Sequence, residues 1–129
     1  TVLQDDDHLN VSLAASSTYY FKFALFTSNA GAAEGIKLAV NGTVGVTALK
    51  AQIRIYDDTL NTLAGFARVT ALDSAVGAGL SAGDNYCEVE GVIETSTTGT
   101  FLLRWAQNVS GASGTTVQRG SSLFVVKLV

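Results

Sequence analysis

Residues 99–129 read GTFLLRWAQNVSGASGTTVQRGSSLFVVKLV, and their apolar pattern indicates the fold class. It contains two apolar runs, Thr100–Ala106 and Ser121–Val129, separated by small and polar residues. In the first run Phe101, Leu103 and Trp105 recur at every second position, which places them on one face of a β-strand. The pattern predicts two strands joined by a loop at residues 109–116, with Trp105 as a ring of the core.

The same alternation of apolar and polar residues occurs upstream and predicts further strands. These strands are Leu9–Leu13, Thr18–Phe26, Ile36–Val40, Val44–Tyr56, Leu63–Leu72 and Asn85–Thr95. The pattern of Val44–Tyr56 fits either one long strand or two short ones. No stretch shows the 3.6-residue period of a helix. About eight short strands at regular spacing are typical of an all-β, antiparallel β-sandwich, most similar to a jelly roll. At 129 residues the chain fits one domain, residues 1–129.

Thr18–Phe26 is the strand richest in aromatic residues. Tyr19, Phe21, Phe23 and Leu25 share one face, and two further rings lie on the other face. Such a row can pack in a core or stack on a sugar, and we expect core packing. The rings on both faces indicate either a central strand or a face that meets a neighbouring subunit.

Glycine and small polar residues mark the predicted turns. Asn41-Gly42 is a strong hairpin signal, because both residues tolerate positive φ. Loops are predicted at Thr27–Gly35 and Asp73–Asp84. The second of these loops is glycine-rich but lacks the Lys-Ser/Thr ending of a phosphate-binding loop.

The composition indicates burial of surface by other chains. Hydrophobic residues make up 47% of the chain and charged residues only 15%, whereas soluble domains usually carry about 25% charged residues. We therefore expect an oligomer. The net charge is −3 and the eight Lys and Arg residues are scattered, which argues against a nucleic-acid partner. No apolar run is long enough to span a membrane.

Few residues suggest chemistry. Asp5-Asp6-Asp7-His8 could supply carboxylate oxygens to calcium, but it lacks the spacing of a calcium loop, so a solvated turn or a strand cap before Leu9 is the preferred interpretation. Cys87 has no second cysteine to pair with and is interpreted as a small strand residue. Because His8 is the only histidine, no nucleophilic triad can be drawn. We expect no catalytic residue, no metal and no cofactor.

Two stretches together resemble a class of tailed-bacteriophage virion structural proteins. The first is Leu3-Gln4-Asp5-Asp6-Asp7-His8-Leu9 followed by Tyr19-Tyr20-Phe21. The second is Gly99-Thr100, then Leu103-Arg104-Trp105-Ala106-Gln107-Asn108, then Gly120-Ser121-Ser122-Leu123. The fourth-position Gln followed by three Asp departs from the Asn-Asp that is usual at the start of this class, and nothing between Asn41 and Asp84 carries the resemblance.

The resemblance implies a non-enzymatic β-sandwich that forms a homotrimer on the outer surface of the virion. Its first implied function is capsid decoration, by binding the major capsid protein or other virion proteins and stabilising the head. The alternative is a tail-fibre or spike domain that binds a receptor on the host surface. The candidate assembly residues are Trp105, Gln107, Asn108, Tyr19, Phe21, Asp6 and Asp7. Gln107 and Asn108 could tie backbone across strands or subunits, because each amide both donates and accepts hydrogen bonds.

Overall fold

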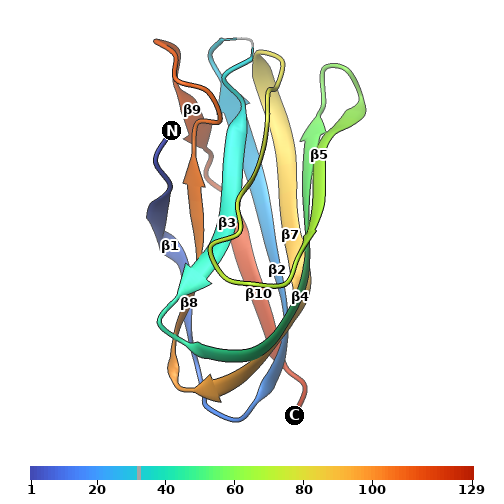
Figure 1. Ribbon diagram of the computed structural model, residues 1–129. Helices are drawn as coiled ribbons and strands as arrows, with labels where there is room; N and C mark the ends of the chain where they lie inside the picture. Colours follow the sequence, from blue (N-terminus) through green and yellow to red (C-terminus); the bar gives the residue numbers. More distant parts are fainter. Residues whose placement is uncertain (32) are drawn as a thin grey trace.

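The computed structural model describes residues 1–31 and 33–129, and the regular structure of these residues is entirely β-strand. Figure 1 shows two layers of strands, with the N- and C-termini toward opposite ends of the sandwich. The ten strands are β1 (Gln4–Leu13), β2 (Thr18–Asn29), β3 (Ile36–Gly42), β4 (Gly45–Asp57), β5 (Thr62–Val69), β6 (Val76–Ala78), β7 (Gly83–Thr97), β8 (Gly99–Ala106), β9 (Thr115–Val117) and β10 (Ser122–Lys127).

The order of the strands is that of a jelly roll. One sheet has the order β1-β8-β3-β6, and the other has the order β10-β2-β7-β4-β5, with β9 also paired to β2. If β9 and β10 are set aside, each sheet has four strands. Every connection from β1 to β8 then crosses between the sheets, except the β4–β5 hairpin. This arrangement is the double-sheet jelly roll, so the predicted antiparallel β-sandwich is confirmed.

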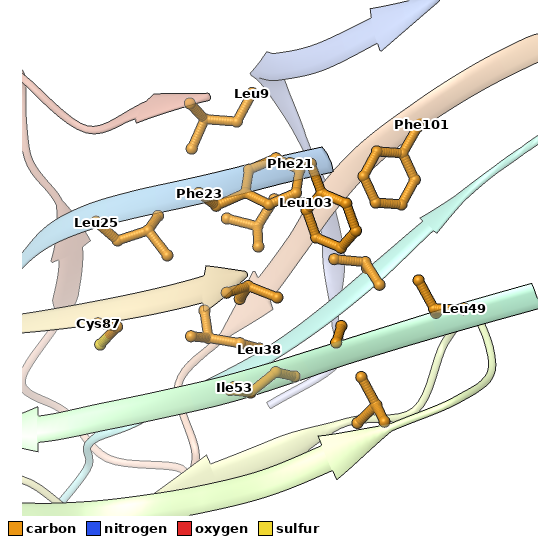
Figure 2. Packing of buried hydrophobic residues seen from close by; sticks show 14 of the residues in the cluster. Leu9, Phe21, Phe23, Leu25, Leu38, Leu49, Ile53, Cys87, Phe101 and Leu103 are labelled. Carbon is orange, nitrogen blue, oxygen red and sulfur yellow. The ribbon is translucent and has the colours of Figure 1, made fainter. Parts of the chain in front are cut away.

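The core is formed by the inward-facing residues of both sheets. On β2, Phe21 and Phe23 are fully buried. They face Phe101 and Leu103 of β8 across the sandwich, as Figure 2 shows. The ring centroids of Phe21 and Phe101 lie 4.8 Å apart in an edge-on arrangement. Burying a large apolar side chain is worth about 1.5–3 kcal/mol, so this layer holds the two sheets together.

Each of the eight predicted strands overlaps an observed strand. The two that the pattern did not reveal, β6 and β9, have three residues each and lie partly or wholly in segments predicted as loops. They are strands because they pair with β3 and β2. Similarly, β2 continues to Asn29 inside the loop predicted at Thr27–Gly35. Residue 32 of that loop lies outside the described residues.

The hairpin predicted at Asn41-Gly42 is wrong. β3 pairs with β8 and β6, whereas β4 lies in the other sheet between β7 and β5. Gly42 has φ of 146°, and a Cβ at this position would lie 2.0 Å from the carbonyl oxygen of Thr100. That oxygen also accepts the backbone N–H groups of Thr43 and Val44 at 3.0 and 3.1 Å. The glycine therefore lets the chain pass closely over β8 on its way to the opposite sheet.

Candidate functional site

Tyr19 and Phe21, two of the predicted assembly residues, lie in the core. Their exposed fractions are 8% and 0%. The hydroxyl of Tyr19 accepts the backbone N–H of Ala14 at 3.0 Å, which ties the β1–β2 turn to β2. Both rings are therefore inaccessible to a sugar or to another subunit.

Trp105 lies at the rim of the sandwich and is only partly buried, which corrects its prediction as a core ring. It follows Phe101 and Leu103 on the same face of β8, but it stands opposite Gln4, where β1 begins. A hollow of about 450 Å³ opens beside it, lined by residues 1–2, 4–8, 105–107 and 114–115. Trp105 is less buried than Phe101 and Leu103 because the hollow opens the space between the two sheets at this end.

Asp6 is fully engaged within the chain. Its Oδ1 accepts the backbone N–H groups of His8 and Leu9 at 2.9 and 2.8 Å, and its Oδ2 accepts the indole N–H of Trp105 at 3.2 Å. These bonds stabilise an irregularity in β1, where the pairing with β8 shifts between Asp5 and Asn10. The predicted turn before Leu9 is thus an irregular part of β1 itself.

The neighbouring carboxylates do not converge. Asp5 contacts the guanidinium of Arg104 at 2.8 Å, and Arg104 also contacts Asp73 at 2.7 Å. Asp7 is exposed, and its backbone oxygen accepts the Asn10 amide at 2.9 Å. Across residues 1–31 and 33–129, no three acidic, histidine or cysteine side chains group as metal ligands would.

Gln107 contacts a loop of its own chain, and Asn108 contacts strand β6. The Gln107 amide donates to the backbone oxygen of Ser113, which closes the loop between β8 and β9. The Asn108 side chain lies against Gly77 of β6, where a Cβ would be 2.1 Å from its Oδ1. Both residues therefore order the end of the sandwich that carries this loop.

The six-stranded sheet has one surface that faces away from the core, and we call it the outer face. The outer face consists of the outward side chains of β10, β2, β7, β4 and β5, and it carries the most elaborate polar cluster. Glu88 of β7 is at its centre, with 13% of its side chain exposed. It contacts Lys22 of β2 at 3.3 Å and Arg54 of β4 at 3.1 Å. Arg54 also lies 3.7 Å from Glu90. Three adjacent strands are thus linked by one network of charges.

Aromatic rings flank this network on the outer face. Tyr86 and Tyr56 lie stacked with their centroids 6.0 Å apart, and Phe26 lies 5.4 Å from Tyr86. These three residues form a row across β2, β7 and β4, because Tyr86 is in register with both of the others. The Tyr86 hydroxyl donates to Glu88 at 3.2 Å, so the row and the network are continuous.

The ionisation of the cluster follows from its burial and its partners. Burial alone would raise the pKa of Glu88, but Lys22, Arg54 and the Tyr86 hydroxyl stabilise the carboxylate, and its pKa lies below the ordinary value. Burial, reinforced by the charge of Glu88, raises the pKa of Tyr86 to about 12. Glu88 is therefore ionised and Tyr86 protonated at neutral pH.

Exposed apolar side chains lie along both margins of the outer face. Phe124 and Val126 on β10 are 58% and 39% exposed, and Phe66 on β5 is 55% exposed. Leu128 and Val129 follow β10 and are also exposed. The described residues thus present an ion-paired centre between apolar margins on a sheet surface, an arrangement suited to contact with another macromolecule.

The sequence carried only part of this signal. The rings of Thr18–Phe26 on both faces indicated that one face could meet a neighbouring subunit. Glu88, Arg54 and Tyr86 come from separate strands, and their grouping depends on the register of β2, β7 and β4.

The chain has no match among known proteins, and its described residues contain no membrane-spanning helix. No family model, no curated protein and no solved structure matches this chain. Within the described residues, no helix has the length and apolar character needed to cross a membrane.

Proposed function

We propose that this chain is a non-enzymatic structural protein of a tailed-bacteriophage virion, and that it decorates the outer surface of the head as a homotrimer. The observation that carries the proposal is the outer face, which offers a broad surface with apolar margins. A protein that binds capsid subunits needs such a surface, because its contribution is buried interface and not chemistry.

Three further features support the proposal. The two stretches that resemble virion proteins lie on strands β1, β2, β8 and β10, so they belong to both sheets of one sandwich. The low content of charged residues fits a chain that is partly covered in its assembly. The candidate acid–base groups of the outer face are tied into ion pairs and hydrogen bonds, which favours a structural role.

One observation favours the alternative, a tail-fibre or spike domain that binds a receptor on the host. Phe26 is 47% exposed and lies beside the stacked rings of Tyr86 and Tyr56. Exposed rings next to hydrogen-bonding groups can stack on the apolar faces of sugars. This row of rings is the place on the described residues where a receptor glycan would bind.

The number of copies per purified particle separates the two functions. Quantitative mass spectrometry of particles should give a copy number comparable to that of the major capsid protein if the chain decorates the head. A few copies per particle would replace decoration with the tail function. Absence from the particle would overturn both.

A further inference from the structure

One edge of β10 is not paired with any other strand of the described residues. β10 ends the six-stranded sheet and pairs with β2 on one side only, with Ser122 opposite Ala24 and Lys127 opposite Tyr19. Among the described residues, no other strand pairs with its second side. Figure 1 shows that β10 and β1 lie at the same side of the two layers.

The backbone bonds show which groups of β10 face outward. On the β10 side of β2, Thr18 donates its N–H to Val129 and accepts that of Leu128. Phe26 accepts the N–H of Gln118 on the same side. The even-numbered residues of β2 therefore direct their backbone groups toward β10. Because antiparallel pairs alternate, Ser122, Phe124 and Val126 of β10 bond back to β2.

The remaining residues, Leu123, Val125 and Lys127, direct their N–H and C=O groups to the free edge. These groups form no hydrogen bond with any other described residue. The side chains of Phe124 and Val126 lie on the outer face and are 58% and 39% exposed. Native edge strands are usually protected by charges, prolines or bulges, whereas β10 carries only Lys127.

We propose that β10 pairs with β10 of a second copy, antiparallel and about a two-fold axis through Val125. In this register Val125 faces Val125 of the partner, and Leu123 faces Lys127 of the partner in hydrogen-bonded pairs. Phe124 then stands opposite Val126 of the partner. The two six-stranded sheets continue into one sheet across the axis.

A second copy is the occupant because the edge is complementary to itself. The outward backbone groups at 123, 125 and 127 map onto one another under the two-fold rotation, as an isologous interface requires. The exposed ring of Phe124 meets the β-branched Val126, which is a favourable cross-strand pair. The charges are also compatible, because each Lys127 faces Leu123 of the partner. Four residues of strand separate the two lysines along the edge, which is about 13 Å.

This contact is independent of the proposed virion function and is also distinct from a three-fold ring. Alone it produces a dimer of twice 13.4 kDa, and a three-fold ring alone produces three times that mass. If the chain forms both contacts, the two-fold contact joins one trimer to another. If the chain is present in virions but does not form this contact, only this inference is wrong. If the chain forms the dimer but is absent from particles, only the proposed function is wrong.

Cysteine cross-linking tests the register directly. The variants are Phe124→Cys and Val126→Cys, each made in the full chain and mixed before mild oxidation. Residues of a non-hydrogen-bonded pair have Cα atoms about 4.5 Å apart, which suits a disulfide. The native Cys87 does not interfere, because it is fully buried and burial raises its pKa to about 12.

We expect a disulfide-linked dimer in the mixture and little in either variant alone, because residue 124 stands opposite residue 126 and not opposite itself. Phe66→Cys mixed with Phe124→Cys is the control for pairing with the β5 edge. No cross-link in the first mixture, equal cross-linking in all samples, or preference for the Phe66 mixture would overturn the proposal.

A second measurement uses exposed sites that leave the fold intact. Val126→Lys would place two extra cations at the contact and should weaken dimerisation about tenfold or more by sedimentation velocity, because an unpaired charge is costly to bury. Phe66→Lys, a change at an exposed position on β5, should leave dimerisation unchanged. A monomeric wild-type chain at high micromolar concentration, or equal effects of the two variants, would contradict the proposal.

Discussion

The indole N–H of Trp105 on β8 donates to Oδ2 of Asp6 on β1 at 3.2 Å. The other oxygen of Asp6 accepts two backbone N–H groups of β1. One carboxylate therefore fixes both the irregular course of β1 and the orientation of the only tryptophan. The N-terminal stretch and the C-terminal stretch that carry the resemblance are joined by this contact.

Asp6→Ala should lower the free energy of unfolding by about 1–3 kcal/mol, because it leaves partly buried donors without a partner. The tryptophan emission should shift to the red as the ring becomes more mobile and hydrated. Urea titration followed by fluorescence measures both effects. Asp7→Ala is the control, since Asp7 is exposed, and it should change neither. Equal effects of the two substitutions would contradict the assigned role of Asp6.

Phe101→Ala should destabilise the chain more than Trp105→Ala. Phe101 is fully buried between Phe21 and Phe23, with ring centroids 4.8 and 5.7 Å away. Removing such a ring costs about 3–5 kcal/mol. Trp105 lies at the rim and should cost clearly less. Thermal unfolding followed by circular dichroism ranks the two variants, and the reverse order would show that the sandwich is closed at the Trp105 end.

The Glu88 network makes stability depend on pH. The folded-state pKa of Glu88 is below its ordinary value, which is about 4.3 for a glutamate in an unfolded chain. The carboxylate therefore contributes stability above that value, and the contribution is lost as pH falls through the lower folded-state pKa. The buried Asp57 acts in the same direction, because backbone N–H groups of Ser81 and Leu60 outweigh its burial and lower its pKa.

Glu88→Gln isolates this contribution. At pH 7 it should destabilise the chain by about 1 kcal/mol, since hydrogen bonds to charged groups at a partly exposed site are worth this order. The difference from wild type should shrink as pH is lowered from 5 to 3. Urea unfolding at a series of pH values gives the measurement. A difference that stays constant over that range would refute the role of the ionised carboxylate.

Gly42→Ala should be strongly destabilising, by about 2 kcal/mol or more. The new Cβ would lie 2.0 Å from the Thr100 oxygen, at φ of 146°. Gly114→Ala is the matched control, because a Cβ there meets nothing within 4 Å. Melting temperatures of the two variants provide the comparison. A tolerated Gly42→Ala would mean that the passage of the chain over β8 is looser than the structure shows.

The fold class and most of the strands could be predicted from local patterns in the sequence. Alternation in Thr18–Phe26 and in Thr100–Ala106 selects the buried faces, because a period of two in a half-buried segment has one low-energy solution. Tyr19, Phe21, Phe101 and Leu103 were predicted to face the core, and they do. The low charge content predicts that other chains bury part of the surface, and this stays a prediction.

The way in which these strands combine depends on contacts between residues that are far apart in the chain. Asn41-Gly42 has local hairpin chemistry, yet the close approach to Thr100 sends the chain to the other sheet. Trp105 lies on the core-facing side of β8, yet its position at the end of the sandwich leaves it only partly buried. Glu88, Arg54 and Lys22 become neighbours through the pairing of β2, β7 and β4. Such contacts join residues distant in the chain, and local periodicity carries no information about which strands become partners.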